Sequence, residues 1–187
     1  MPAVCNLMEK TMANKRNEEI ASMTKEALAL ALGELMMAKK NCSITALCQR
    51  AGVSRPAFYR HFKDLDEVVF YYLILGWAEY CKKAGYDGQP IDEVTGHLIR
   101  YFYSKREFIR ALKNQNKTYL VENLFRALLI QPAAEGPGRY EAYLKTYLVY
   151  SVIRAMIDND FAETPEQVEA MLQILQQENS QKMNGPA

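Results

Sequence analysis

The chain has 187 residues, of which 49% are hydrophobic and 24% charged, with a formal net charge of +1. This composition is typical of a folded globular protein with a sizeable core and argues against a disordered chain. No apolar run approaches the ~20 residues of a membrane-spanning helix, and residues 1–19 lack the apolar segment of a signal peptide. We therefore expect a cytoplasmic protein, with one large helical domain or a small domain joined to a larger one.

Four cysteines are scattered along the chain: Cys5, Cys42, Cys48 and Cys81. None of their spacings is that of a metal site or of a C-x-x-C redox motif. We expect reduced thiols of a cytosolic protein, with redox sensing as a minor alternative.

The charge is unevenly distributed. Residues 1–63 contain ten Lys and Arg against five Glu, whereas residues 64–187 contain thirteen against seventeen Asp and Glu. A basic N-terminal part favours a polyanionic partner for that part alone. On charge alone, an ordinary solvated surface with a chance asymmetry is an equal alternative.

Residues 17–40, NEEIASMTKEALALALGELMMAKK, have the spacing of an amphipathic helix. Asn17 is a suitable N-cap, with two glutamates in the first turn and Lys39 and Lys40 at the end, as the helix dipole favours. The expected buried stripe consists of Ile20, Thr24, Ala27, Leu28, Ala31 and Leu35.

Two short helices are expected next. The first, in SITALCQRAG, is capped by Ser43 and ends at Gly52, because glycine adopts the left-handed conformation of a tight turn. The second is capped by Ser54 and has Pro56 in its first turn, where a missing N–H costs little. The residues of the first that point inward are Ile44, Leu47 and Cys48.

The second short helix has two aromatic residues, Phe58 and Phe62, four positions apart and therefore on one face. We expect them to anchor it to the two preceding helices, as in a helix–turn–helix. The residues left on the outside are Arg55, Pro56, Tyr59, Arg60 and His61.

Such an outer face fits a DNA major groove. Arg55, near the helix N-terminus, is placed to contact guanine O6 and N7, whereas Tyr59 and His61 suit phosphate oxygens or a thymine methyl group. The alternative is a surface helix with ordinary polar residues, and the combination of cap, anchors and outer residues favours the DNA-binding interpretation.

The segment SITALCQRAGVSRPAFYRHFKDLDEVV, residues 43–69, resembles the DNA-binding segment of the TetR (tetracycline-repressor-like) family of bacterial transcriptional regulators. The resemblance covers residues ~17–70 by motif and rests on helix layout beyond them. It implies an all-helical homodimer with an N-terminal three-helix DNA-binding domain, at residues 1–63 after a flexible start. Residues 64–187 would form a larger C-terminal domain that dimerises and binds a small-molecule effector.

By this resemblance, residues 55–62 form the recognition helix. Two positions depart from the family pattern: Leu65 replaces a lysine common at the start of the fourth helix, and Thr45 replaces a common arginine. Both departures predict weaker phosphate contacts, which Lys63 offsets in part. Asp64 and Glu67 form a D-x-x-E capping pattern for the fourth helix. The implied DNA contacts are Ser43, Thr45, Ser54, Arg55, Pro56, Tyr59, Arg60, His61 and Lys63.

The rest of the chain has the pattern of further helices. A long helix over 65–85 would link the two domains and, by the resemblance, transmit the effector signal. Residues 132–138 are an expected loop, and 178–187 an expected disordered tail. The other expected helices cover 91–104, 106–115, 117–131, 139–160 and 164–177.

The last two of these helices resemble the four-helix dimer interface of the family. In the final one, Thr164 is an expected cap with Pro165 at the first helical position. The expected interface residues are Tyr143, Tyr147, Tyr150, Val168, Met171, Leu172 and Leu175.

Eleven of the twelve tyrosines follow residue 63. Aromatic rings of this part are candidates for an effector pocket, although rings at helical spacing more often belong to a core or a dimer interface. His97 and Arg100 are titratable or charged groups with no partner evident from the sequence. The candidate pocket residues are Tyr71, Trp77, Tyr101, Phe102, Phe108, Tyr119, Phe125 and Tyr147.

An enzyme is not expected, because the chain lacks a phosphate-binding glycine loop, a metal-spaced cluster and a nucleophile with its base. No cofactor or metal is expected. We predict an all-α homodimeric regulator that binds a palindromic DNA operator and is released by an effector, most simply a repressor, with activation open. The alternative is a dimeric helical module whose helix–turn–helix contacts a protein.

Overall fold

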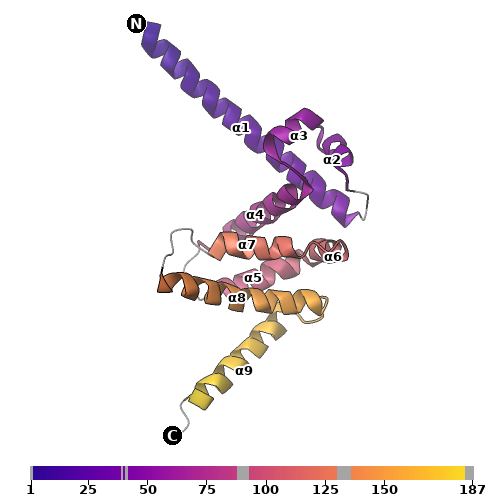
Figure 1. The fold of residues 1–187 in the computed structure, drawn as a ribbon, viewed down its shortest axis with the longest axis vertical. Coiled ribbons are helices and arrows are strands. Elements are labelled where there is room, and N and C mark those ends of the chain that lie inside the picture. Colours follow the sequence, from indigo (N-terminus) through magenta and orange to yellow (C-terminus); the bar gives the residue numbers. More distant parts are fainter. Residues whose placement is uncertain (1, 39, 41, 88–92, 130–135, 184–187) are drawn as a thin grey trace. The chain divides into compact units, whose positions relative to one another are not determined.

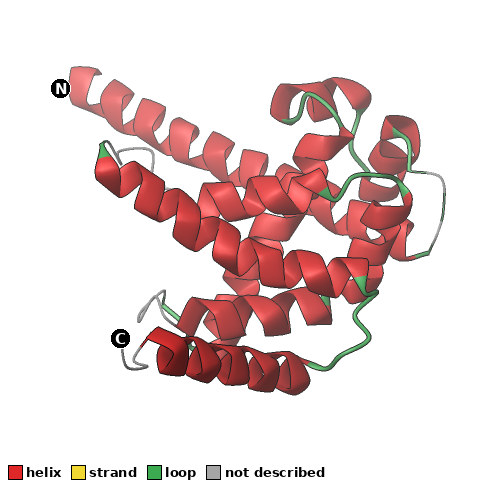
Figure 2. Cartoon of the chain, turned by 60° about the horizontal axis from the view of Figure 1, so that its bottom comes forward, coloured by secondary structure: helices red, strands yellow, loops and turns green. Residues whose placement is uncertain are grey.

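The computed structural model describes residues 2–38, 40, 42–87, 93–129 and 136–183. Every regular element in these ranges is a helix, as Figure 2 shows, which confirms the predicted all-α fold. None of these helices is long and apolar enough to cross a membrane. They are α1 (Pro2–Met37), α2 (Ile44–Ala51), α3 (Arg55–His61), α4 (Leu65–Ala84), α5 (Val94–Ser104), α6 (Arg106–Asn114), α7 (Tyr119–Leu129), α8 (Pro137–Asp158) and α9 (Pro165–Met183).

The chain divides into two compact units, residues 1–76 and residues 77–187. The sequence suggested a division between residues 63 and 64, before the fourth helix. In the structure the division falls inside α4, whose residues up to Gly76 belong to the first unit. The reason is packing, because Val68, Val69 and Leu73 of α4 are buried.

α1 begins at Pro2, so the segment expected as a flexible start is helical, and Asn17 lies inside the helix and is not its cap. Residues 3–16 are rich in helix formers and contain no Gly or Pro, which lets the helix continue through a residue that could have capped it. At its other end α1 stops at Met37, before Lys40, and Lys39 lies outside the described residues.

The predicted stripe of α1 is buried only towards its C-terminal end. Leu28, Ala31 and Leu35 are buried, whereas the side chain of Ile20 is 53% exposed. Within the first unit, α2 and α3 pack against α1 and against each other (Figure 1). The core here therefore starts about two turns later than the sequence pattern suggested.

The second unit has α5 at its centre, in contact with α6, α8 and α9, while α6 and α7 also pack on α8 (Figure 1). α5 can be surrounded because its apolar residues cover more than one face, as the burial of Leu98, Ile99, Tyr101 and Phe102 shows.

Two helix ends differ from the sequence prediction. α8 starts at Pro137, inside the expected loop over 132–138, because proline is well suited to the first helical turn. α9 continues to Met183, so the first part of the expected disordered tail is helical. Residues 132–135 and 184–187 lie outside the described residues.

Candidate functional site

The turn between α2 and α3 forms as its sequence predicts. The Ser43 hydroxyl oxygen accepts a hydrogen bond from the Ala46 N–H at 3.2 Å, which caps α2. Gly52 ends α2 with φ 66°, in the left-handed region, and the Val53 N–H returns to the Cys48 carbonyl at 2.9 Å. These local bonds fix the direction in which the chain leaves α2.

α3 is then held in place at its start and along its inner face. The Ser54 hydroxyl oxygen accepts from the Ala57 N–H at 3.3 Å. Phe58 is fully buried and Phe62 nearly so, with their ring centroids 6.1 Å apart. Phe62 also meets the ring of Tyr71 in α4 at 5.7 Å. The rotation of α3 about its axis is thereby set.

This rotation leaves four side chains of α3 exposed: Arg55, Pro56, Tyr59 and Arg60, which we call the outer face. Tyr59 is 53% exposed, and its ring stands edge-on to Phe58 at 5.2 Å. Arg60 Nε is 3.5 Å from the Pro56 carbonyl, at the limit of a hydrogen bond, so its guanidinium is weakly held.

The other predicted DNA contacts lie around this face with different exposures. His61 is half-buried rather than fully outside, and Ser43 is half-buried in its capping role. Thr45, Ser54 and Lys63 are exposed.

The start of α4 carries its predicted cap in a shifted form. Asp64 Oδ1 accepts from the Glu67 N–H at 3.0 Å, as expected. Glu67 Oε2 accepts from the Lys63 N–H at 2.7 Å, one residue earlier than a capping box requires. The Lys63 Nζ is 3.9 Å from Asp64 Oδ2, so the charge of this lysine is partly balanced.

Two further contacts in this unit were not evident from the sequence. Arg50 Nη2 pairs with Glu34 Oε2 of α1 at 2.6 Å, which ties the end of α2 to α1. Burial raises the pKa of the Cys48 thiol, opposed by the positive charge of Arg55, and a protonated thiol is a poor nucleophile. Pairs sixteen residues apart have no local sequence signal.

In the second unit, α8 and α9 line an open hollow of about 420 Å³. Most of its lining is apolar, from Val152, Ala155 and Met156 of α8 and from residues of α9. Four of the predicted interface residues line it: Val168, Met171, Leu172 and Leu175.

The three tyrosines predicted for the same interface lie elsewhere on α8. Tyr143 is half-buried, Tyr147 is exposed, and Tyr150 is buried edge-on against Phe125 at 5.4 Å. Apolar side chains that the prediction missed are more exposed, namely Tyr140, Leu144 and Leu148 of α8 and Ile174 of α9. Helical spacing alone does not show which side of a helix its neighbours leave open.

The predicted effector-pocket residues do not line this hollow. Four of them, Tyr101, Phe102, Phe108 and Phe125, are fully or almost fully buried in the core of the second unit. Tyr71 belongs to the first unit and Tyr119 is exposed. Trp77 is half-buried and stacks on Tyr80 at 5.5 Å, with Tyr101 edge-on at 5.4 Å.

His97 and Arg100 both have partners in the structure. His97 Nδ1 is 3.2 Å from the Tyr80 hydroxyl, and the Tyr86 ring stacks on the imidazole at 4.2 Å. Desolvation by burial raises the pKa of the Tyr80 hydroxyl above its ordinary value. Arg100 Nη2 pairs with Glu169 Oε2 at 2.7 Å, which joins α5 to α9.

A scan against protein-family models and a search of curated proteins both gave no match for this chain. Within the described ranges, no group of three or more His, Cys, Asp or Glu could hold a metal ion. The feature with the clearest chemical meaning is therefore the outer face of α3, a capped and anchored helix that exposes two guanidinium groups and a phenol.

Proposed function

We propose that this protein is a DNA-binding transcriptional regulator of the TetR type, with α3 as its recognition helix. The observation that carries the proposal is the division of α3 into two faces. Phe58 and Phe62 are buried, while Arg55, Tyr59 and Arg60 are exposed. A short helix with a polar, cationic outer face on a fixed inner face is what major-groove binding requires.

Each exposed side chain has chemistry that suits DNA. Arg55 stands at the first position of α3, where a guanidinium can form two hydrogen bonds to one guanine. Tyr59 and Arg60 follow one turn later and suit phosphate oxygens, which position a protein without selecting a sequence. Arg55 is therefore the side chain from which we expect base preference.

The first experiment is the selection of DNA fragments by the purified protein from its source genome, at two salt concentrations. We expect enrichment of a short inverted repeat and weaker binding at the higher salt, because phosphate contacts release counterions. Failure to enrich any site at low salt would contradict DNA binding and favour a helix–turn–helix that contacts a protein.

The second experiment substitutes Arg55→Ala and measures affinity for the selected site and for random DNA. We expect a cost of ~1–3 kcal/mol at the selected site and a relaxed preference at one base pair. Lys83→Ala is the control, because it removes one positive charge from a lysine paired with Glu79 in the second unit. Equal losses on both DNAs would make Arg55 a phosphate contact instead.

We further propose that two copies associate through α8 and α9. The hollow is lined by apolar side chains, and Leu144, Leu148 and Ile174 are each more than half exposed. A two-fold axis would let α9 of each copy cover the hollow of the other, which makes one surface complementary to itself. A homodimer also matches an inverted repeat, one recognition helix for each half-site.

Ile174→Glu tests this association by sedimentation velocity. We expect a monomer, because a charge in an apolar interface loses its hydration without gaining a partner. Gln173→Glu, on the neighbouring exposed position of α9, is the matched control for charge. If Ile174→Glu sediments as a dimer like the unchanged protein, α9 does not form the contact.

A small-molecule effector remains part of the proposal, without an assigned site, because Tyr101, Phe102, Phe108 and Phe125 fill the core of the second unit. Release would require the effector to bind the form that does not hold DNA more tightly than the form that does. A screen of small molecules for release of the bound operator tests this, with stabilisation against heat as the second measurement. A compound that stabilises the protein but does not release DNA would not be its effector.

A further inference from the structure

The corner between α8 and α9, residues 159–164, has an unusual backbone. Asp160 and Phe161 have φ values of 55° and 54°, so two successive non-glycine residues are in the left-handed region. Side chains with a Cβ avoid this region, and such residues persist only where the surroundings hold them.

Part of the hold is internal to the corner. Phe161 is buried, and its N–H donates to the Met156 carbonyl at 2.7 Å. Its ring stands edge-on to Tyr103 at 6.5 Å. The Asn159 amide donates to both carboxylate oxygens of Glu163, at 2.7 and 2.9 Å.

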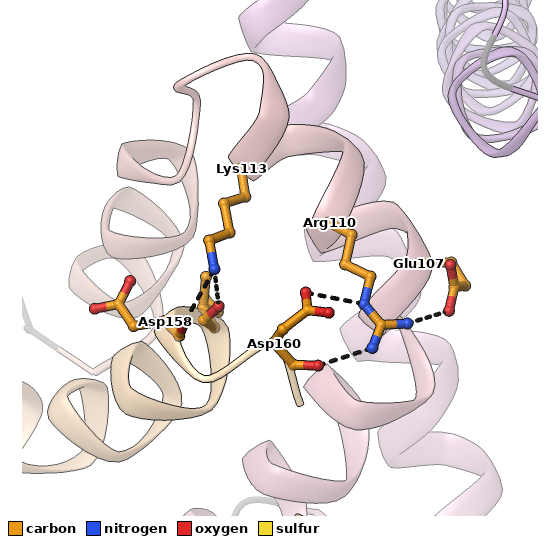
Figure 3. Close-up of polar contacts among 6 residues, drawn as sticks. Glu107, Arg110, Lys113, Asp158 and Asp160 are labelled. Carbon is orange, nitrogen blue, oxygen red and sulfur yellow. Dashed lines mark hydrogen bonds and ion pairs between the residues drawn. The ribbon is translucent and has the colours of Figure 1, made fainter. Parts of the chain in front are cut away.

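The other contacts that hold the corner come from α6, as Figure 3 shows. Arg110 Nε donates to Asp160 Oδ1 at 3.1 Å, and Nη2 donates to the Asp160 carbonyl at 2.8 Å. One guanidinium therefore binds both the side chain and the backbone of a residue in the left-handed region. Glu107, one turn earlier on α6, accepts from the remaining terminal nitrogen of Arg110.

Lys113 lies three positions after Arg110, on the same face of α6. Its ammonium donates to the Ile157 carbonyl at 2.8 Å and to the Asp158 carbonyl at 3.1 Å (Figure 3). These carbonyls end α8, and the Ile157 carbonyl also accepts from the Asp160 N–H at 3.2 Å. A cation here also suits the negative end of the helix dipole.

We infer that these four hydrogen bonds, which we call the clamp, make Arg110 and Lys113 positioning residues of the homodimer surface. The corner joins the two helices that form the hollow, and Asn159 and Glu163 of the corner also line it. The direction in which α9 leaves α8 therefore sets the shape of the apolar surface that a second copy would contact. Arg110 and Lys113 are themselves outside the lining.

This inference rests on the proposed homodimer. Its test is the dimer dissociation constant of Arg110→Met and Lys113→Met, from sedimentation velocity far below the melting temperature. We expect at least a roughly tenfold weaker dimer in each variant, with circular dichroism unchanged, because the apolar surface is kept but no longer held in shape. Lys83→Met is the matched control, since Lys83 pairs with Glu79 on α4 at 2.7 Å and not with the corner.

Two more variants separate positioning from loss of fold. Arg110→Lys keeps the charge but loses the planar, forked guanidinium that spans the side chain and the carbonyl of Asp160, so we expect a weakened dimer and a folded chain. Asp160→Gly in the Arg110→Met background should recover part of the affinity, because glycine adopts a φ of 55° without help.

The outcomes distinguish the clamp from the dimer itself. If the unchanged protein is a monomer, both the proposed homodimer and the positioning role of the clamp are overturned. A dimer whose dissociation constant is the same in Arg110→Met, Lys113→Met and the unchanged protein would overturn the clamp alone. A dimer weakened only in variants that also lose helicity or melt early, with no recovery in Asp160→Gly, would show a structural cap and overturn the positioning role.

Discussion

At the scale of single residues, the buried side chains of α3 stabilise the fold, whereas the side chains of its outer face are free to bind. Tyr59 lies between these roles, because its ring contacts Phe58 while its side chain is about half exposed. The contact between the Tyr59 ring and Phe58 does not involve the hydroxyl group. The two parts of the side chain can therefore be tested separately.

Tyr59→Phe keeps the ring and removes the hydroxyl. We expect an unchanged free energy of unfolding in urea, and weaker binding to operator DNA through the loss of one hydrogen bond, ~0.5–1.5 kcal/mol. Fluorescence anisotropy with a labelled operator measures the second quantity. Unchanged affinity would mean that the Tyr59 hydroxyl does not contact DNA.

Asp158 gives a second residue-scale prediction, for acid solution. The hydrogen bond from Arg154, at 2.8 Å, holds the pKa of the Asp158 carboxyl below its ordinary value of 3.8. A depressed pKa adds stability that is fully present above 3.8 and is lost as the pH falls through the folded-state value. Asp158→Asn should therefore be less stable than the unchanged chain at neutral pH, by a small amount because the pair is exposed.

In urea titrations at several pH values, the gap between these two proteins should close in acid below 3.8. Arg154→Gln should lose the same pH-dependent part of the stability, because it removes the same pair, together with the bonds of Arg154 to Tyr150 and Thr118. A gap of constant size across the acid range would show that the pair does not act through the carboxylate charge.

At the scale of elements, the turn between α2 and α3 depends on the backbone of one glycine. Gly52 has φ 66°, and a Cβ added there would meet no atom within 4 Å. Gly52→Ala should thus destabilise the protein by ~1–2 kcal/mol through backbone conformation alone. Gly52→Asn should cost less, because asparagine adopts this region more readily. Equal costs for both, measured by urea unfolding, would contradict this reason.

At this scale, the sequence predicts local helix caps better than contacts between distant helices. The predicted caps at Ser43, Ser54 and Thr164 are confirmed. They could be predicted because each cap bond joins residues three positions apart. The predicted cap at Asn17 is wrong, because a capping residue permits a helix to start but does not force it to start there. Helix formers before Asn17 let α1 continue. Arg110 with Asp160 could not have been predicted, because the partners are fifty residues apart and meet only after α6 packs on α8.

The candidate site shows the same contrast. The two faces of α3 followed from the spacing of Phe58 and Phe62, a local property, although Phe62 caps α3 in an extended conformation and does not continue it. The hollow between α8 and α9 could not be predicted in this way, because its lining depends on which sides of the two helices their neighbours leave open. For this reason Tyr150 was expected at an interface and is buried against Phe125, while Ile174 was missed and is exposed.

At the scale of the whole molecule, the two proposed contacts should differ in their response to salt. Operator binding should weaken steeply, with a slope of about −0.9 in log affinity against log salt for each phosphate contact. Association through α8 and α9 should change little, because its surface is mainly apolar. The same protein, titrated from low to high salt by anisotropy and by sedimentation, should lose DNA while it stays a dimer. Parallel losses would contradict a mainly apolar contact between the two copies.

One helix belongs to both units, because the division of the chain falls between Gly76 and Trp77 inside α4. Trp77 is the only tryptophan of the chain and stacks on Tyr80. Its indole emission therefore comes from a single place, beside Tyr80, Tyr86 and Tyr101 of the second unit. The protein thus carries an intrinsic optical probe, and a shift in its emission maximum on adding DNA or a small molecule would report a change around these rings without any label.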